Sequence, residues 1–504
     1  MAARVCGVSR RRLPGRIIPL SRALCTASST YDYDVLVVGG GIAGAALACR
    51  LAGPDFLQGF RIGLVEARPP PPLESVMKRD APDPRVYSFT PESVKLMKEV
   101  GVWDRVSSRT QPFRSMQVWD KHGHGFMRFD GDDVGGSELG HIVEHSSLQS
   151  SLFERLSELE GEGLLDLLCP GSVESAVFGA VKQGSAPDAP MEVTVGNSEG
   201  KQVLRTRLLV AADGGASVIR RLRGMPTWGW GYGQKALVAT VRVQMHHDTA
   251  WQRFLPSGPL ALLPLWGEYS SFVWSTTPAE ADTLLALPED EFLQQLNDAL
   301  RSQVEESEST AQQPLLREAY FPPHHSMNAA HTGRVPPTLL SPQIRAASSV
   351  SRAVALLSSA HKPFEQPPAA IELCTRRFAF DLSLQQAKAY AGARIALVGD
   401  AAHTVHPMAG QGLNLGLADV SSLAGVLAEG KQSGVDLGSS HLLARYETDR
   451  KAKNLAMMGG LNALHHLFGS PSAAVAALRN IGIGSLNALG PIKARVAKYA
   501  TGRM

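Results

Sequence analysis

The feature of this sequence that most constrains its fold is a glycine-rich turn near the N-terminus. Residues 34–38 (DVLVV) form a short apolar run that predicts a buried strand, and Gly39, Gly41 and Gly44 follow it at the spacing G-x-G-x-x-G. An alanine-rich run that predicts a helix comes next, and a second apolar run ends at Glu66, about 20 residues beyond the last glycine. This order predicts the dinucleotide-binding unit of a Rossmann-like α/β fold.

Each residue of this motif meets a physical requirement. Gly39 allows the tight turn after the strand, Gly41 lets the backbone approach a pyrophosphate, and Gly44 lets the helix pack closely on the strand. The helix N-terminus then presents its N–H groups to the phosphates. Glu66, which ends the strand predicted for residues 61–65, is placed to accept hydrogen bonds from ribose hydroxyls. An ordinary strand-to-helix turn is the alternative, and the positions of the helix and the acid favour dinucleotide binding.

Two later apolar runs end in similar turns. Residues 207–212 and 394–398 predict strands that are followed by Asp213-Gly214 and by Gly399-Asp400. Asp400, at the carboxyl end of its strand, is placed to bind a ribityl or ribose hydroxyl.

The stretch after Asp400 extends this pattern. Gly410 and Gly412 allow close approach of the backbone, and a helix predicted from about Leu413 to Leu427 directs its positive end towards the same place. A reduced flavin carries negative charge on its pyrimidine edge, which a helix N-terminus stabilises. One such turn alone is compatible with a plain connection, whereas three in this order indicate a single cofactor site.

Together these stretches resemble the para-hydroxybenzoate-hydroxylase-like flavoprotein monooxygenases, which share an N-terminal G-x-G-x-x-G, a middle Asp-Gly and a late Gly-Asp. Within that class the chain is similar to the mitochondrial ring hydroxylases of ubiquinone biosynthesis. The stretches that carry this narrower resemblance are Asp83-Pro84-Arg85-Val86, LGHIVEH (139–145) with Leu148-Gln149, QKALVATV (234–241), QRFLPSGPLALLPL (252–265), GDAAHTVHPMAGQGLNLGLAD (399–419), and Tyr446-Glu447 with Arg450 and Asn454. Ser146 and Ser147 depart from the bulkier or basic residues of such relatives, so no cofactor contact is assumed for them.

The resemblance implies FAD as the cofactor and places the loop from Pro407 to Asn414 against the isoalloxazine. Arg85 and Gln149 are expected near the other side of that ring. His406 and Pro407 are the candidates for contact with the reacting atoms, although a histidine in such a loop is more often a hydrogen-bonding scaffold than an acid or base. No metal site is expected. The expected cofactor-binding residues are Gly39, Gly41, Gly44, Glu66, Arg85, Gln149, Asp213, Gly214, Gly399, Asp400, Gly410, Gly412, Leu413 and Asn414.

The resemblance also implies an interleaved α/β architecture, in which a three-layer Rossmann-like FAD-binding domain alternates with a β-sheet substrate domain. The FAD-binding domain is expected at 32–105, 141–227 and 380–430, and the substrate domain at 106–140 and 228–379. Within the latter, residues 302–368 are rich in Ser and Pro, which favours a flexible insertion over a lid or docking arm. C-terminal helices with a basic tail are expected over 440–504.

In the chemistry implied by the resemblance, reduced FAD reacts with dioxygen to give a C4a-hydroperoxide, which transfers oxygen to an electron-rich phenol. The implied substrate is a polyprenyl-4-hydroxybenzoate that is hydroxylated at C5. Only one dinucleotide motif is present, so electrons are expected from a ferredoxin–ferredoxin reductase chain or otherwise from NAD(P)H. The resemblance also implies that the protein acts within a membrane-associated ubiquinone-biosynthesis complex.

The net charge of +3 conceals an uneven distribution. Residues 1–31 carry six Arg and no acid, which is typical of a mitochondrial transit peptide over 1–30, with a retained basic tail as the alternative. Residues 450–504 carry eight Lys or Arg and no acid, so the body between the two ends is acidic. The basic C-terminus, including Lys493, Arg495 and Lys498, is expected to contact the matrix side of the inner membrane peripherally. A solvated basic end is the alternative, and nucleic-acid binding is not supported because aromatic residues are not interleaved with these charges.

Two other functions compete with the monooxygenase. A flavin dehydrogenase or prenyl-group reductase shares the N-terminal motif, and a non-enzymatic prenyl-binding escort protein uses the same fold without redox chemistry. The intact Asp213-Gly214 and the complete stretch 399–414 favour a working flavin site over both.

Overall fold

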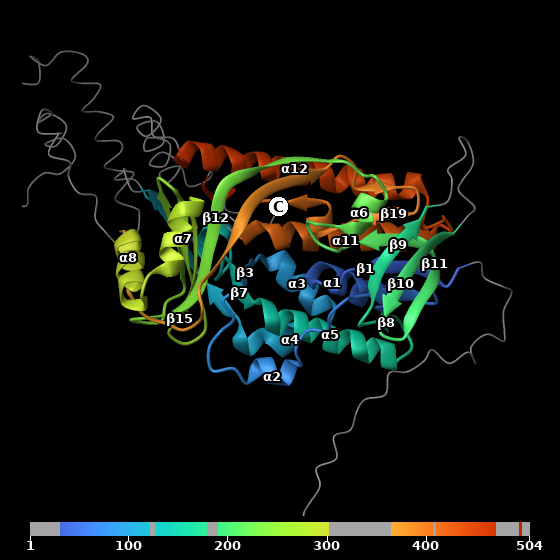
Figure 1. Cartoon of the computed structure of the whole chain (residues 1–504), viewed down its shortest axis with the longest axis horizontal. Helices are drawn as coiled ribbons and strands as arrows, with labels where there is room; N and C mark the ends of the chain where they lie inside the picture. The colour runs from blue at the N-terminus through green and yellow to red at the C-terminus, as the bar shows by residue number, and fades with distance from the viewer. Residues whose placement is uncertain are drawn as a thin grey trace, which may run out of the picture.

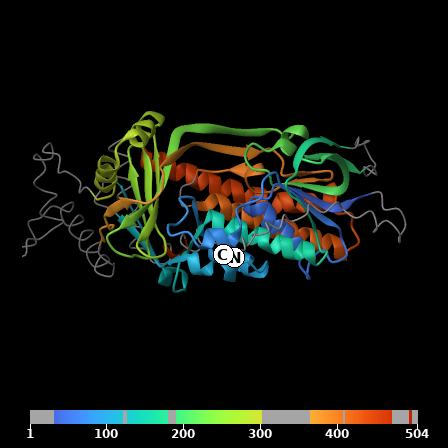
Figure 2. The same cartoon turned by 60° about the horizontal axis from the view of Figure 1, so that its bottom comes forward.

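The computed structural model describes residues 31–120, 126–178, 190–301, 364–406, 410–469 and 493–495. The expected transit peptide at 1–30 and the catalytic candidate Pro407 lie outside these ranges. Figure 1 shows two sheets towards opposite ends of the molecule, with helices between them. The long strand β12 (Thr227–Val243) runs from one end to the other, and Figure 2 shows the same arrangement after rotation.

The first sheet contains the glycine-rich motif. Strand β1 pairs in parallel with β2 and β11, and β11 pairs in parallel with β19. The order is β18-β19-β11-β1-β2-β8, and β10 and β9 extend it by antiparallel pairing from β11. β1 and β2 are almost wholly buried, which is why each reads as a continuous apolar run. The strands are β1 (Tyr33–Val38), β2 (Ile62–Val65), β8 (Asp166–Leu168), β9 (Ser172–Val177), β10 (Met191–Asn197), β11 (Gly200–Ala211), β18 (Ala391–Gly392) and β19 (Ile395–Leu397).

Helices surround this sheet. α1 (Ile42–Leu51) contacts both α5 (His145–Gly161) and α11 (Gln411–Gln432), and α11 packs against α12 (Ser440–Gly469). Ala45, Ala46 and Ala48 of α1 are fully buried, and their small side chains allow this close approach. α11 begins two residues before the predicted start and continues five residues past the predicted end. Shorter helices are α2 (Leu73–Met77), α3 (Pro91–Glu99), α4 (Trp103–Val106) and α6 (Val218–Leu222).

The second sheet has the order β20-β17-β12-β15-β14-β13-β5-β6, and β16 pairs with β12. Its own apolar core includes Trp251, Phe272 and Phe292, under α7 (Pro278–Ala286) and α8 (Glu289–Arg301). The strands are β5 (Ser115–Asp120), β6 (Phe126–Asp130), β12, β13 (Thr249–Leu255), β14 (Gly258–Pro264), β15 (Tyr269–Thr276), β16 (Ala370–Leu373), β17 (Phe378–Ala387) and β20 (His403–Thr404). A third, small sheet contains β3 (Val86–Phe89), β7 (Gly140–Glu144) and β4 (Gln111–Phe113).

Two expected boundaries differ from the structure. Strand β17, at 378–387, pairs with β12 and so belongs to the second sheet, whereas the FAD-binding segment was expected from 380. The end of the expected flexible insertion is packed: the ring of Phe364 contacts Trp119 at 5.7 Å, and Pro367 and Pro368 are buried. The rest of that insertion, 302–363, lies outside the described residues.

One residue of the basic C-terminus, Lys493, has a partner within the protein. Lys493 Nζ lies 2.7 Å from Asp133 Oδ2, and the lysine side chain is only 11% exposed. This lysine is therefore held by the chain itself and is not free to face a lipid surface. Within the described ranges, no helix combines the length and apolar character needed to cross a bilayer.

Candidate functional site

The three motif glycines have three different surroundings in the turn between β1 and α1. Gly39 has φ +106°, and a Cβ there would lie 2.4 Å from the Ala212 carbonyl oxygen. A Cβ on Gly44 would lie 1.9 Å from the Gly39 oxygen, whereas a Cβ on Gly41 would meet nothing within 4 Å. Gly39 and Gly44 are therefore required by packing, and Gly41 borders open space at the N-terminus of α1, where a phosphate group fits.

The backbone N–H and carbonyl of Gly40 are each hydrogen-bonded to a predicted site residue. Its N–H donates to Glu66 Oε2 at 2.6 Å, and its carbonyl accepts from Gln149 Nε2 at 3.3 Å. The second oxygen of Glu66 accepts from the Arg68 N–H at 2.9 Å. Glu66 and Gln149 thus meet at the glycine turn although they come from β2 and α5.

The Asp213-Gly214 turn lies directly behind this loop. Asp213 Oδ1 accepts from Ser217 Oγ at 2.5 Å, and Oδ2 accepts from the Val218 N–H at 2.7 Å. These bonds satisfy donors at the start of α6. Gly214 adopts φ +82°, which favours glycine. Asp213 therefore buttresses the turn by accepting hydrogen bonds from the start of α6.

The Gly399-Asp400 turn is anchored by a buried cluster on α11 and α12. Asp419 Oδ2 accepts from the Gly399 N–H at 3.1 Å and lies 2.6 Å from His403 Nε2. The other oxygen, Oδ1, accepts from Arg450 Nε at 2.9 Å and from Asn454 Nδ2 at 3.2 Å. Both the Asp419 and His403 side chains are fully buried. His403 is thus a structural partner of Asp419, in agreement with the scaffold interpretation of histidines in this loop.

The pKa values of the two acids near His403, Asp419 and Asp400, are shifted in opposite directions. Burial alone would raise the pKa of Asp419, but His403 and Arg450 outweigh it and hold the pKa of this carboxyl below its usual value. The side chain of Asp400 reaches the surface of the site. The packed protein around it nevertheless raises the pKa of Asp400, against the opposing effects of His403 and Arg85.

The N-terminus of α11 is tied to the third sheet by an asparagine. Gly410 precedes the helix with φ +63°, and a Cβ there would lie 3.0 Å from Ser88 Cβ. Asn414 donates to the Ser88 carbonyl at 2.8 Å and accepts from Ser93 Oγ at 2.7 Å. Asn414, predicted to bind the cofactor, thus orients the end of the helix. Gly412 and Leu413 lie in the first turn of α11, and Leu413 packs against the main core.

Arg85 lies beside a pair of partly buried aromatic rings. Its guanidinium stacks over the Tyr87 ring at 5.6 Å, and Tyr87 Oη lies 3.0 Å from His145 Nδ1. Burial and the charge of Arg85 lower the pKa of His145 to about 4, and burial raises the pKa of Tyr87 to about 12. Both groups are therefore neutral near pH 7.

A second buried ion pair supports this corner. Glu144 accepts from Arg109 Nε at 2.9 Å, from the Trp266 indole at 2.8 Å and from the Asp83 N–H at 2.8 Å. Asp83 in turn accepts from the N–H of Ser146 at 3.1 Å. Ser146, for which no cofactor contact was assumed, thus binds Asp83 within the protein.

His406, the catalytic candidate inside the described residues, is 1% exposed and packs edge-on against Tyr232 with ring centroids 4.9 Å apart. Tyr232 belongs to an apolar cluster that joins the second sheet to the start of α11 and to α12. Its members include Phe254, Val405, Leu415, Met458 and Phe468. Because His406 directly precedes the loop to α11, this cluster lies beside the site predicted for the flavin ring.

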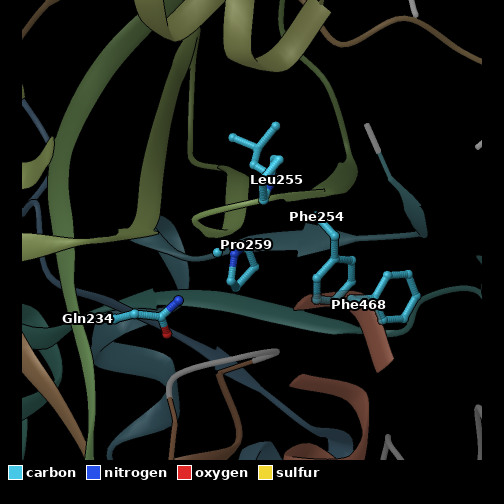
Figure 3. A pocket seen from close by; sticks show the side chains of 7 residues that line it. Gln234, Phe254, Leu255, Pro259 and Phe468 are labelled. Carbon is cyan, nitrogen blue, oxygen red and sulfur yellow. The ribbon is translucent and has the colours of Figure 1, made fainter. Parts of the chain in front are cut away.

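A cavity of about 160 Å³ opens at the edge of this cluster (Figure 3). The rings of Phe254 and Phe468 stack at 3.8 Å beside it. Among the side chains that line it only the Gln234 amide is polar, and backbone polar groups border it as well; the lining residues are Gln234, Phe254, Leu255, Pro256, Gly258, Pro259 and Phe468.

The glycine turn, the Gly399-Asp400 turn and the α11 N-terminus suit a bound FAD, since Gly41 leaves open space for a phosphate at the N-terminus of α1 and α11 begins without a side-chain cap. Sequence reasoning missed the anchoring role of Asp419 and the pairing of Glu144 with Arg109. Both acids stand within stretches quoted for the resemblance, but nothing in the local pattern indicates their distant basic partners.

Comparison with known proteins agrees with this geometry. The family described as FAD binding domain matches residues 32–335 and 352–459. The ubiquinone biosynthesis monooxygenase COQ6 of Rattus norvegicus is 34% identical over 484 residues, which cover 94% of this chain and 92% of the relative. The Homo sapiens protein of the same name is 32% identical over 509 residues, covering 99% of this chain and all of the relative.

Solved structures share the fold at low identity. The p-nitrophenol 4-monooxygenase PnpA of Pseudomonas putida matches with a TM-score of 0.63 and 16% identity, covering 94% of this chain and 99% of its own. PqsL of Pseudomonas aeruginosa matches with a TM-score of 0.61 and 21% identity, covering 90% of this chain and 99% of its own. FAD is the cofactor, and a monooxygenase also needs an organic substrate, dioxygen and a reductant. The chain belongs to the mitochondrial family of FAD-dependent ubiquinone biosynthesis monooxygenases.

Proposed function

We propose that this chain hydroxylates C5 of the aromatic ring of a polyprenyl-4-hydroxybenzoate during ubiquinone biosynthesis. The observation that carries the proposal is the cavity at the Phe254–Phe468 stack, which belongs to the same apolar cluster as Val405 and Leu415. A cavity of about 150 Å³ accommodates a benzene ring, so about 160 Å³ suffices for one aromatic ring. The open side of such a site leaves room for an apolar substituent.

Residues from four separate stretches would hold FAD. The N-terminus of α1 at Gly41 would bind the pyrophosphate, Glu66 the ribose and Asp400 the ribityl chain, and the N-terminus of α11 would bind the flavin. Bound there, FAD supplies the redox chemistry that activates dioxygen for oxygen transfer. Gln149 lies at the glycine turn, where it binds the Gly40 carbonyl, and Arg85 lies over the ring of Tyr87.

The chain's own contribution to the reaction is positioning and the exclusion of water. Phe254, Met458 and Phe468 form apolar walls around the ring, and Tyr232 packs against His406 at the edge of the loop. Such walls keep water from the reacting atoms. We assign His406 a packing role in this wall, because its ring is buried against Tyr232. Pro407, the next residue in the chain, is the other candidate for contact with the reacting atoms.

The reductant and the location follow from the same proposal. One dinucleotide motif serves FAD, so we propose a ferredoxin and its reductase as donors, with NAD(P)H as the alternative. A polyprenyl substrate resides in a bilayer, and we propose peripheral contact with the matrix side of the inner membrane, within a ubiquinone-biosynthesis complex. Arg495, which is exposed, supports a lipid contact more directly than Lys493, which is paired with Asp133.

The mass of the product tests the function. The chain without residues 1–30, loaded with FAD, is incubated with 3-prenyl-4-hydroxybenzoate and a reducing system of ferredoxin, its reductase and NADPH. The expected product gains one oxygen atom, and its NMR spectrum places the new hydroxyl at C5. Loss of hydrogen or saturation of the prenyl group instead identifies a dehydrogenase or prenyl reductase. Tight binding of the prenylated ring without any turnover identifies an escort protein.

A further inference from the structure

One face of the second sheet is less completely covered than the other. Trp251 and Leu255 of β13 belong to the apolar core under α7 and α8, so Gln252, between them in sequence, lies on the opposite face. The middle of that opposite face is only partly buried, whereas the core members are buried. The partly exposed residues are Met116, Ala261, Leu263 and Val273. The face that carries Gln252 therefore borders space that the protein does not fill.

This face is turned towards the two stretches predicted to hold the flavin ring. Phe254, two residues after Gln252, belongs to the cluster that contains residues from both sides of the loop into α11. Ala250, two residues before it, belongs to another cluster, against which Val86 packs, directly after Arg85. Gln252 thus lies between a cluster at the α11 loop and a cluster at the Arg85 stretch.

Two hydroxyl groups on the same face join the sheet to the Arg85 stretch. Thr240 Oγ1 donates to the Pro82 carbonyl at 3.5 Å, and Ser271 Oγ donates to the Pro84 carbonyl at 3.4 Å. These hydroxyls already have protein partners. They fix the face of the sheet beside the stretch that ends in Arg85.

Gln252 differs from these hydroxyls because its amide has no protein partner. The residue is 5% exposed, and in the part of the chain that the structure describes its side chain forms no hydrogen bond. Its Oε1 and Nε2 are not closed off by protein atoms, in contrast to Gln234 Oε1. Buried polar groups in native proteins are nearly always paired, and one without a protein partner points to a water or a ligand.

The position of Gln252 relates it to the cavity at the Phe254–Phe468 stack. Phe254 pairs across the sheet with Pro259, and both residues line the cavity (Figure 3). Gln252 and Ala261 form the next pair on the same face. Successive residues on one face of a strand are about 7 Å apart. An aromatic ring at the Phe254–Pro259 pair can therefore present a polar substituent to the Gln252 amide.

We propose that Gln252 is a specificity-determining residue for the substrate and that its amide binds the ring hydroxyl. This inference rests on the proposed function and names the group of the substrate that the protein recognises. Oε1 accepts from the neutral hydroxyl, and Nε2 donates to the same oxygen when it is a phenolate. A carboxylate would use Nε2 alone and would leave its charge unpaired among apolar side chains. A ring without the hydroxyl leaves the amide unpaired and is bound less tightly.

The test measures binding to the FAD-loaded protein through the change in flavin absorbance. The two probes are 3-prenyl-4-hydroxybenzoate and 3-prenylbenzoate, which lacks the hydroxyl. The wild-type protein is expected to bind the hydroxylated probe about tenfold more tightly, which corresponds to one hydrogen bond. Gln252→Met keeps the length of the side chain without its polar atoms. It is expected to weaken the hydroxylated probe to the level of the other probe, whose affinity stays unchanged.

A second buried glutamine provides the matched control. Gln117 lies on the neighbouring strand β5, on the face of Trp119, and its amide donates to the Glu365 carbonyl at 2.8 Å and accepts from the Glu365 N–H at 3.1 Å. Gln117→Met is expected to lower the unfolding temperature, because it removes both partners of Glu365, and to keep the preference between the probes. Gln252→Met removes no protein contact and is expected to leave the unfolding temperature of the substrate-free protein unchanged.

The outcomes distinguish this inference from the proposed function. An unchanged preference in a folded Gln252→Met protein overturns the role of Gln252, and so does a weakening of both probes, which would place the carboxylate at the amide. A wild-type protein that hydroxylates the prenylated ring without preferring the hydroxylated probe overturns the inference alone. A wild-type protein that shows the preference but never adds oxygen to the ring overturns the proposed function, while recognition by Gln252 stands.

Discussion

At the scale of single residues, two glycines of the same motif have different roles in this site. Gly44 is required because its Cα lies against the Gly39 carbonyl, whereas Gly41 borders open space. The first is a condition for the fold and the second for the ligand. A sequence motif cannot separate the two roles, because both are satisfied by the same residue type.

The two glycines give a matched pair of variants. Gly44→Ala is expected to prevent correct folding or to destabilise the protein by more than about 3 kcal/mol, since backbone must move to admit the methyl group. Gly41→Ala is expected to leave the unliganded fold intact and to lower FAD affinity at least tenfold, because the methyl group enters the path of the pyrophosphate. Thermal unfolding of the FAD-free protein and titration with FAD measure the two effects. Equal loss of stability in both variants would refute this division.

Two partly buried histidines predict a pH dependence of stability. The pKa of His145 is about 4, and burial likewise lowers the pKa of His247 to about 4. Unfolded histidine has a pKa near 6.5, so between about pH 6.5 and 4 the unfolded chain binds more protons than the folded one. Stability therefore rises with pH across this window and is lost as the pH falls towards 4.

The contribution of each histidine is measurable as a difference. The unfolding temperature of wild-type protein is followed from pH 7 to 4.5 by flavin fluorescence, beside His145→Gln and His247→Gln. Each variant is expected to lose part of the wild-type slope, and the double variant more. A double variant as steep as the wild type would show that carboxyl groups alone set the acid sensitivity.

Residue identity in the candidate site was more predictable than residue role. Glu66, Gln149 and Gly40 do meet, because a parallel strand and the turn beside it share one edge of the sheet. Asp213 and Asn414 lie where the motifs place them, yet their polar atoms are occupied by α6 and by the third sheet. Only tertiary contacts reveal that these groups are already satisfied.

At the scale of elements, Asp419 connects the Gly399-Asp400 turn to two long helices. One carboxylate on α11 binds the turn through the Gly399 N–H and His403, and binds α12 through Arg450 and Asn454. The position of α12 is thereby transmitted to the loop predicted to hold FAD. Breaking one member of such a buried cluster leaves the others without a counter-charge.

The same two helices provide a control for this cluster. Asp419→Asn is expected to destabilise the protein by about 3 kcal/mol or more and to weaken FAD binding. Glu429→Gln removes the exposed ion pair with Arg445, which also joins α11 to α12, and is expected to change stability by less than about 1 kcal/mol. Urea unfolding of both FAD-loaded variants gives the comparison. Similar losses of unfolding free energy in the two variants would mean that the buried Asp419 pair stabilises the protein no more than the exposed Glu429 pair does.

The elements themselves were predictable where periodicity is strong and the element local. The strand predicted over 34–38 is β1 at Tyr33–Val38, and the one over 394–398 is β19 at Ile395–Leu397. The sheet to which β17 belongs was not predictable, because alternation of apolar residues identifies a strand but not its partner. Its pairing with β12 joins residues about 150 positions apart.

At the scale of the whole molecule, charge at the C-terminus divides between folding and any lipid contact. Lys493 is paired with Asp133 and lies near the Phe129 ring, whereas Arg495 is exposed. Lys493→Met is therefore expected to lower the unfolding temperature without changing sedimentation with anionic vesicles. Arg495→Gln is expected to reduce vesicle affinity by about fivefold, since one basic residue near such a surface contributes about 1 kcal/mol. Reduced vesicle binding of a stable Lys493→Met protein would show that Lys493 does contact the lipid surface.

The crossing of the chain between its two sheets has a consequence for how such enzymes diversify. Each sheet draws its strands from stretches that are separated in sequence by strands of the other, and β12 and β17 run between them side by side. A single recombination event between relatives therefore cannot transplant the wall that contacts a substrate without also replacing strands that support the cofactor. Change in what these proteins oxidise is consequently easier to reach by point substitution at the shared wall than by the exchange of modules.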